Sequence, residues 1–378
     1  MPDKQAIEYI YHQADDYFSS IITAINQARS HIDMEVYIFD IDSVGKRIAK
    51  ALLRAALRDV KVRLVVDGMG ANSDFIPIAQ QLKTAGALVR IHRPLPWHFK
   101  LWAFSLASTK GLQKFWYLLN YINQRNHRKL LIIDQNKVWI GSINVSQKHY
   151  SIAQGGENWR DTAVFINNIR TNTLLSVYKL NWLNKKRKEK KRLTKELSSA
   201  PFLLNFTHQL RQLQRNKLLS RITSAKSHIW ITNAYFTPDS KLLNALILAS
   251  SRGVDVRIVL PHKSDVFFMP WVASFFYEQL LSKRIRVYEY KKGILHAKTL
   301  IIDRWASIGS SNFNQRSLRH DLEIDYVLQS NNSIDQLADH FQTDLKHSEE
   351  LHHAELKTKK PWQRYLGGLI LILFSYWL

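Results

Sequence analysis

The sequence HRKLLIID at residues 127–134 decides the fold, because it returns as HAKTLIID at residues 296–303. Each copy has the form H-x-K-x4-D, and each is followed by a Gly-Ser-x-Asn turn, at residues 141–144 and 309–312. One H-x-K-x4-D arises by chance in roughly a few per cent of chains this long, but two copies with the same following turn are far rarer. The chain is therefore predicted to contain two copies of one unit.

The repeat extends well upstream of these motifs. ARSHIDMEVYIFDIDS at residues 28–43 aligns with AKSHIWITNAYFTPDS at residues 225–240, an offset of 197 residues, and VKVRLVVD at 60–67 parallels VDVRIVLP at 254–261. In each unit a helix ends near the Ser-His pair and a β-rich run follows. A helix with apolar residues at three- and four-residue spacing, a second strand and a strand carrying the histidine motif come next. This alternation predicts an α/β fold, with helices covering each sheet.

Length and composition agree with two domains. The chain has 378 residues, enough for two units of about 190 residues each, and its formal net charge is +23. Such a charge favours an anionic partner, whether lipid, nucleic acid or phosphorylated substrate. The absence of cysteine excludes disulfides and thiolate chemistry. The predicted organisation is a first domain at 1–183 (motif 121–148), a basic linker at 184–200, a second domain at 201–350 (motif 290–317) and a basic-apolar tail at 351–378.

The two motifs are predicted to build one shared active site. Residues two apart on a strand point to the same face, so His127 lies beside Lys129 and His296 beside Lys298. Two such units, related by a pseudo-two-fold axis, give a pocket of two imidazoles and two ammonium groups that suits a phosphodiester. One histidine attacks phosphorus while the other protonates the leaving oxygen. The lysines supply the charge that a metal would otherwise bring, so no metal and no cofactor are expected.

Further polar residues surround these four. Asn144 and Asn312, with Ser142 and Ser310 of the same turns, are expected to bind the phosphate. Asp134 and Asp303 complete the motifs and are grouped with the catalytic residues, although strand alternation does not place them in the pocket. A structural role, satisfying backbone or lysine groups, is the favoured alternative. Asp161 and Glu323 are expected to orient the histidines by accepting from the second ring nitrogen, with an exposed surface acid as the alternative for each.

These motifs resemble those of the phospholipase D superfamily, and within it the bacterial cardiolipin synthases of the phospholipase D type. The resemblance covers residues 35 to about 327. Its more specific cues are the segments NHRK at 126–129, GG at 155–156, WRD at 159–161 and GSSN at 309–312, with Arg316, Ser317 and Glu323.

The resemblance implies two tandem phospholipase D-like α/β/α domains and a two-step exchange through a phosphohistidine. His127 would be the nucleophile, and His296 would protonate the departing glycerol and then deprotonate the incoming alcohol. Phosphatidylglycerol would be both donor and acceptor, giving cardiolipin. A phospholipase D or phosphatidylserine synthase-like enzyme remains the alternative, because only the acceptor differs. A nuclease is less favoured, no nucleic acid partner is expected, and no oligomeric state is assigned.

Membrane contact is predicted from aromatic, basic and apolar segments. Aromatic clusters precede both motifs, at 97–104 with 115–117 and at 267–277, and suit a bilayer interface or else a packed core. The basic run at 184–192 is either a solvated face or a headgroup contact. The uncharged run at 365–378 is too short to span a bilayer and is expected to insert partly, the alternative being packing on the protein. The predicted location is the cytoplasmic side of the cell membrane, peripheral or tail-anchored.

Overall fold

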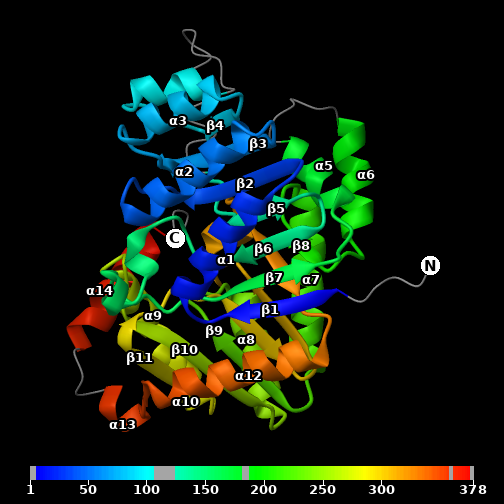
Figure 1. Ribbon diagram of the computed structural model, residues 1–378. Coiled ribbons are helices and arrows are strands. Elements are labelled where there is room, and N and C mark those ends of the chain that lie inside the picture. Colours follow the sequence, from blue (N-terminus) through cyan, green and yellow to red (C-terminus); the bar gives the residue numbers. More distant parts are fainter. Residues whose placement is uncertain (1–5, 106–123, 181–186, 357–360, 375–378) are drawn as a thin grey trace.

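The computed structural model describes residues 6–105, 124–180, 187–356 and 361–374, and consists of two mixed β-sheets with helices (Figure 1). The first sheet has the order β1-β7-β6-β5-β2-β3-β4. Its strands are β1 (Ile7–Tyr11), β2 (His31–Ile38), β3 (Lys61–Gly70), β4 (Leu88–His92), β5 (Leu130–Ile133), β6 (Lys137–Gly141) and β7 (Ala163–Asn167).

The second sheet repeats the same order with one strand added. It runs β15-β11-β10-β9-β12-β13-β14-β8, so β9 to β14 correspond to β2 to β7, and β8 corresponds to β1. Its strands are β8 (Phe202–Leu204), β9 (His228–Thr232), β10 (Asp255–Lys263), β11 (Arg286–Ile294), β12 (Thr299–Ile302), β13 (Trp305–Gly309), β14 (Ile324–Val327) and β15 (Ser348–Glu350). The duplication predicted from the sequence is thus confirmed strand by strand.

Helices such as α1, α2 and α8 cover the outer faces of the two sheets, and the inner faces pack against each other with α5 and α12 beside them. The helices are α1 (Ala14–Gln27), α2 (Ser43–Ala56), α3 (Phe75–Thr84), α5 (Asn172–Leu180), α6 (Arg187–Leu197), α7 (His208–Ser224), α8 (Ser240–Ser251), α9 (Met269–Ser274), α10 (Tyr277–Ser282), α11 (Gln315–Arg319), α12 (Asn331–Lys346), α13 (His353–Leu356) and α14 (Pro361–Phe374). Short 3-10 turns lie at Phe99–Phe104, Gln147–His149 and Ile152–Gln154.

The strand period of two explains these layers. In β5, Leu131 and Ile133 face α1 and α2, whereas Leu130 and Ile132 face the other half of the chain. The inner cluster joins Leu130 and Ile132 to residues of the second sheet, including Ile308 and Tyr326. One continuous apolar core therefore holds the two halves together.

The histidine motifs lie just outside the strands that were predicted to carry them. His127 and Lys129 precede β5, and His296 and Lys298 precede β12. The reason is that these segments bond to the other half instead of to a neighbouring strand of their own sheet. The N–H of His127 donates to the carbonyl of Leu322 at 2.9 Å, and the N–H of His296 donates to that of Arg160 at 2.8 Å.

The basic run and the tail both contain helices. Helix α6 lies within the predicted linker at 184–200, overlaps the basic run and buries Leu193 and Leu197. Helix α14 packs on α9, where the glycine at 367 lets the two backbones meet: a Cβ there would lie 2.0 Å from the carbonyl oxygen of Trp271. Within the described ranges, no helix is both long and apolar enough to cross a membrane.

Candidate active site

The first histidine is held by a carboxylate from the second half. His127 Nδ1 lies 3.0 Å from one oxygen of Glu323, which also accepts from Ser310 Oγ at 2.5 Å and Ser317 Oγ at 2.6 Å. Because the carboxylate only accepts, His127 donates from Nδ1 and keeps Nε2 as the atom with the free lone pair. Glu323 and His127 are both buried.

The second histidine is held by a carboxylate from the first half. His296 Nδ1 donates to Asp161 at 2.8 Å, and Ser142 Oγ donates to the same carboxylate at 2.7 Å. The two halves therefore exchange their acids, and each exchange lies beside a short backbone bridge, Asn126 with Leu322 and Arg160 with Leu295. The prediction that Asp161 and Glu323 orient the histidines agrees with these contacts, and both acids are buried.

The lysines are fixed in matching ways. Lys129 Nζ donates to the carbonyl of His127 at 2.8 Å, and Lys298 Nζ donates to that of His296 at 2.5 Å. Each ammonium also lies over a tyrosine ring, Tyr37 at 5.2 Å and Tyr235 at 5.8 Å from the centroid. Sequence reasoning missed both tyrosines, which lie at or beyond the ends of β2 and β9 within the repeated segments.

Burial sets the protonation of this group. It lowers the pKa of His127 well below its usual range, with Lys129 and Lys298 acting in the same direction. It also lowers the pKa of His296 to about 4, against which the charge of Asp161 acts. Burial lowers the pKa of Lys129 to about 7, helped by the charge of Lys298, and that of Lys298 to about 8.

The two acids differ from each other. Burial raises the pKa of Glu323 above its usual value. Burial acts in the same direction on Asp161, but His149 and His296 outweigh it and hold the pKa of Asp161 well below the usual range. His296 therefore faces the more firmly ionised carboxylate.

The expected phosphate ligands divide into two groups. Asn144 and Asn312 are buried beside the site, where Asn144 Oδ1 accepts from the N–H of Ile38 at 3.2 Å. Ser142 and Ser310 are corrected: each is fully buried, and its hydroxyl donates to Asp161 or Glu323. These serines support the acids that hold the histidines, because their turn points them beneath the pocket.

The motif aspartates are also corrected, in favour of the structural alternative. Asp134 accepts from the backbone N–H groups of Arg29, Ser30 and His31, at 2.8–3.2 Å, and from the Ser30 hydroxyl. Asp303 accepts in the same way from residues 226–228. Both follow the last residue of the motif strand with positive φ, +49° and +50°. Asp134 ties β5 to the segment between α1 and β2, and Asp303 ties β12 to the segment between α7 and β9. Neither side chain reaches the pocket.

A third histidine, missed in the sequence, completes the site. His149 Nδ1 donates to Asp161 at 2.6 Å, and its Nε2 accepts from the backbone N–H of Asn144 at 3.3 Å. Ser317 takes this place in the second half, donating to Glu323 and accepting from the N–H of Asn312 at 3.1 Å. Both residues lie five positions after the asparagine of Gly-Ser-x-Asn, so aligning the two turns would have found the pair.

Comparisons with known proteins agree with this geometry. A family model described as "Cardiolipin synthase, PLD-like domain" matches residues 21–176 and 218–345. The cardiolipin synthase of Clostridium perfringens (strain SM101 / Type A) is 32% identical over 351 residues, which cover 89% of this chain and 70% of that protein. Cardiolipin synthase 1 of Bacillus anthracis is 30% identical over 375 residues, covering 95% and 70%.

A solved structure supports the fold. The phosphatidylserine synthase of Haemophilus influenzae Rd KW20 superimposes with a TM-score of 0.69 at 14% identity, covering 98% of this chain and 94% of that one. Two H-x-K-x4-D halves around one site define an enzyme of the phospholipase D type. The chain belongs to the cardiolipin synthase family of phospholipase D-like proteins.

The pairs His149–Asp161 and Ser317–Glu323 are predicted to be interchangeable only as pairs. In the first half the longer donor, His149, binds the shorter acid, Asp161. In the second half the shorter donor, Ser317, binds the longer acid, Glu323. His149→Ser should lower kcat/KM about ten- to hundredfold, because one hydrogen bond to a charged group is lost. Adding Asp161→Glu should restore much of that loss, whereas His149→Ala/Asp161→Glu should not. Steady-state kinetics on phospholipid substrate measure this, with thermal unfolding as the control for folding. Equal activity of the two double variants would contradict the pairing.

Proposed function

We propose that this chain joins two phosphatidylglycerol molecules into cardiolipin and releases glycerol, through a phosphohistidine intermediate. One observation carries the proposal: two histidines, each with Nδ1 bound to a buried carboxylate of the other half, lie beside two buried lysines. This arrangement leaves both Nε2 atoms free for chemistry on a phosphodiester.

In the first step His127 Nε2 attacks phosphorus. The P–N bond forms as the bond from phosphorus to the glycerol oxygen breaks, and His296 Nε2 gives its proton to that oxygen. Lys129 and Lys298 stabilise the charge that grows on the non-bridging oxygens. Free glycerol then leaves, with the phosphatidyl group on His127.

In the second step His296 acts as a base instead of an acid. The hydroxyl of a second phosphatidylglycerol gives its proton to His296 Nε2 while its oxygen attacks phosphorus. The P–N bond breaks, and His127 returns to its neutral form. The net reaction consumes two phosphatidylglycerols and yields one cardiolipin and one glycerol.

The surroundings of the histidines support this division of roles. A nucleophile must be neutral, and burial together with the neighbouring lysines lowers the pKa of His127 well below its usual range. A general acid must carry a proton; burial lowers the pKa of His296 to about 4 in the free protein, and the ionised Asp161 acts against this shift by favouring the charged ring. The negative phosphodiester, once bound, favours that charge further.

The choice of donor and acceptor rests on the relatives, which are named cardiolipin synthases. Water as acceptor would give a phospholipase D reaction and serine would give phosphatidylserine, with the same histidines in both cases. Purified protein incubated with labelled phosphatidylglycerol in vesicles should form labelled cardiolipin and free glycerol. Phosphatidic acid as the sole labelled product would replace the transfer proposal by hydrolysis.

The nucleophile is predicted to be His127. His127→Ala should abolish covalent labelling by a phosphatidyl donor, because no P–N bond can form. His296→Ala should still label but turn over poorly, because the leaving alcohol receives no proton. Rapid quench at mildly alkaline pH, where a phosphoramidate survives, followed by a denaturing gel measures this. Label retained in His127→Ala and lost in His296→Ala would reverse the two roles.

The alkaline limb of the pH profile is predicted to report the two lysines. Since the pKa of Lys129 is about 7 and that of Lys298 about 8 in the free protein, kcat/KM should fall as pH rises through this range and the ammonium charges are lost. The kcat limb should lie at higher pH, because a bound phosphodiester favours both charges. In Lys129→Arg the charge at position 129 is no longer lost near pH 7, so the alkaline limb should move upward by about one pH unit. An unchanged alkaline limb in Lys129→Arg would show that the limb does not report the ionisation of Lys129.

We further propose that the protein lies peripherally on the anionic, cytoplasmic surface of the cell membrane. Helix α14 presents an outward apolar face at helical spacing, made of Trp362, Tyr365, Leu369 and Ile372, which are 45–81% exposed. Phe267 and Phe275 stand exposed beside α9, on which α14 packs. The part of the first aromatic cluster at 115–117 lies outside the described residues.

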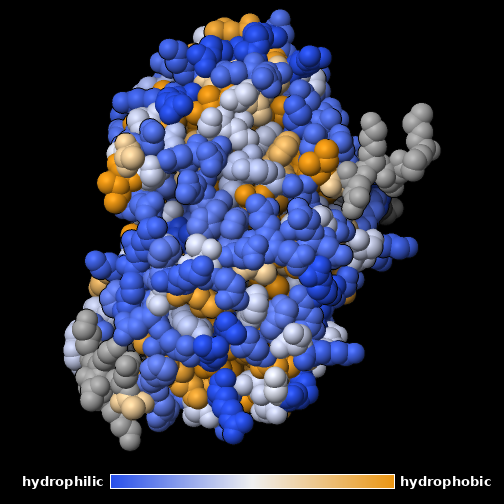
Figure 2. All heavy atoms as spheres, turned by 60° about the horizontal axis from the view of Figure 1, so that its bottom comes forward, coloured by the Kyte–Doolittle hydropathy of each residue, from blue (hydrophilic) through white to orange (hydrophobic). Residues whose placement is uncertain are grey.

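The charge of the protein would strengthen this contact. On the face shown in Figure 2, hydrophilic side chains dominate and apolar residues form small separate patches. The net charge of +23 would add attraction to anionic headgroups, up to about 1 kcal/mol for each basic residue near them. The tail, in this proposal, both packs on the protein and faces the lipid.

The α14 face is predicted to carry the salt-resistant part of membrane binding. Tyr365→Ser/Ile372→Ser should weaken binding to phosphatidylglycerol vesicles about tenfold or more at high salt, because two apolar side chains leave the bilayer. Co-sedimentation at low and high salt measures this. The matched control is Leu57→Ser/Leu248→Ser, two exposed leucines on α2's C-terminal turn and α8. Equal loss in both double variants would show that α14 has no special part.

A further inference from the structure

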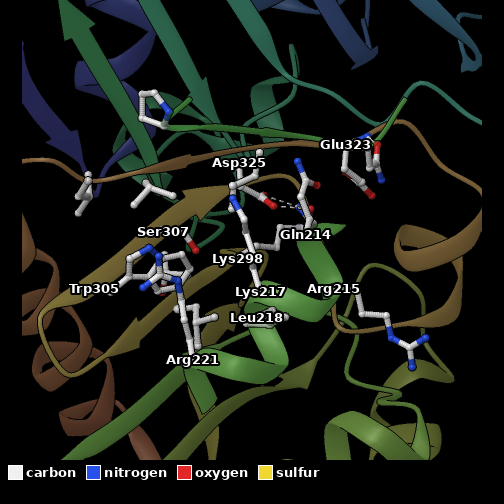
Figure 3. A pocket seen from close by; sticks show the side chains of 18 of the residues that line it. Gln214, Arg215, Lys217, Leu218, Arg221, Lys298, Trp305, Ser307, Glu323 and Asp325 are labelled. Atoms are coloured by element: carbon white, nitrogen blue, oxygen red, sulfur yellow. Dashed lines mark hydrogen bonds between the residues drawn. The ribbon is translucent and has the colours of Figure 1, made fainter. Parts of the chain in front are cut away.

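A cavity of about 530 Å³ lies between helix α7 and the strands β12, β13, β14 and β8 (Figure 3). Its lining extends from residues of α7 to the active-site residues Lys298, Asn312 and Glu323. Its volume falls in the range of sites that bind small organic ligands. Arg211, Lys217, Arg221, Leu218, Leu300 and Val327 are among the residues that line it.

The cavity lies where the middle of α7 has no fully buried side chain. Leu210 and Ile222 are its buried residues, and they stand twelve positions apart, about 18 Å along the helix. Between them α7 turns Gln214 and Leu218 to the cavity, with Lys217 toward its outer side. In this middle stretch the Gln214 amide donates to the carbonyl of Leu204 at 2.8 Å, and Leu218 and Leu219 pack against the core shared with α8.

The same place in the first half is filled. Helices α1 and α7 end alike, since the N–H groups of Ala28 and Ala225 bond to the carbonyls of Ile25 and Ile222, so the 197-residue offset holds through both helices. At that offset the buried residues of α1 correspond to residues of very different character in α7. Tyr17 corresponds to Gln214, Phe18 to Arg215, Ile21 to Leu218 and Ala24 to Arg221.

The strands show the same exchange. Counting back from the shared Gly-Ser turn, Trp139 corresponds to Ser307, and strand pairing matches Phe165 with Val327 and Tyr11 with Leu203. In the first half Trp139 stacks at 4.5 Å on Phe165 and is buried. All three second-half counterparts line the cavity. One copy of the unit thus has an aromatic plug where the other has a hollow.

Two of the residues that replace the plug, Arg215 and Arg221, are cationic, and Lys217 lies beside them on α7. Arg221 lies over the ring of Trp305 at 4.8 Å, and Lys217 Nζ donates to the carbonyl of Ser198 at the rim. Arg215 is paired with Asp239, and the carboxylate of Asp325 within the cavity is held by Ser311. Positive charge at the rim and apolar surface at Leu218, Leu300 and Val327 describe a site for a molecule with both characters.

We propose that this cavity binds an anionic amphiphile, a phosphate ester carrying a short apolar chain. The phosphate lies against Arg221 and Lys217 at the rim, and the chain enters between α7 and the sheet. This site is separate from the pocket that holds His127 and His296, neither of which lines it. Because Glu323 lines its inner wall and also holds His127, an occupant touches the support of the catalytic histidine.

Binding of decyl phosphate, below its micelle concentration, to the full-length protein tests the proposal by calorimetry without any turnover. The expected result is saturable binding of one molecule per chain. Arg221→Met keeps the packing on Trp305 but removes the charge, and should weaken binding about tenfold or more. Ser307→Trp, which copies Trp139, should abolish binding. Arg192→Met, on the exposed face of α6, is the control for loss of one positive charge.

Each other outcome overturns the proposal in a defined way. Inorganic phosphate binding as tightly as decyl phosphate would leave an anion site without a chain site, and neutral decyl maltoside binding equally would leave no anion site. Undiminished binding in both Arg221→Met and Ser307→Trp would place the ligand elsewhere. If Ser307→Trp does not fold, Arg221→Met against Arg192→Met still decides. A protein that binds decyl phosphate here but makes no cardiolipin would contradict only the proposed function.

Discussion

The exchange of carboxylates between the two halves is the interaction on which the site depends. Glu323 of the second half fixes His127, and Asp161 of the first half fixes His296. Neither half alone can set the tautomer or direction of its own histidine, so the site exists only when both halves are folded and docked. The apolar inner faces of the two sheets supply that docking, and the bridges at Asn126 and Arg160 set its register.

Burial gives this site both its strength and its sensitivity to pH. Removing charges from water is costly unless hydrogen bonds and opposite charges replace the solvent. Glu323 therefore accepts from three side chains, and Asp161 does the same. For the lysines, burial outweighs the attraction of nearby carboxylates such as Glu323 and Asp161, so it moves their pKa toward neutrality. A phosphodiester brings the charge that the empty site lacks, which makes substrate binding and lysine protonation one coupled event.

The sequence predicted what local repetition encodes and missed what docking creates. The repeated motifs revealed two α/β units, the His-Lys pairs and the orienting acids, because strand alternation and the chemistry of phosphate transfer act locally. It could not say which acid meets which histidine, since that depends on contacts across the halves. Asp134 and Ser142 were misplaced because each binds a partner far away in the sequence, the backbone at residues 29–31 for Asp134 and the Asp161 carboxylate for Ser142. The Ser-His pair at 30–31, noticed only as a repeat, proves to be where Asp134 binds.

The duplicated halves have diverged in a pattern that follows from their packing. Near the histidines a change on one side needs a matching change on the other, as in His149 with Asp161 against Ser317 with Glu323. Under the outer helices no such geometry is imposed, and a plug of Trp139 and its neighbours can be lost if something else holds the helix. Helix α7 keeps Leu210 and Ile222 buried and packs against the core shared with α8, so the space beneath it can change from core to cavity while the helix stays in place. Lys217 and Arg221 are exposed at the rim of this hollow, and Leu218, Leu300 and Val327 line it. The combination of positive charge at the rim with apolar surface inside is the physical reason to expect an anionic amphiphile there.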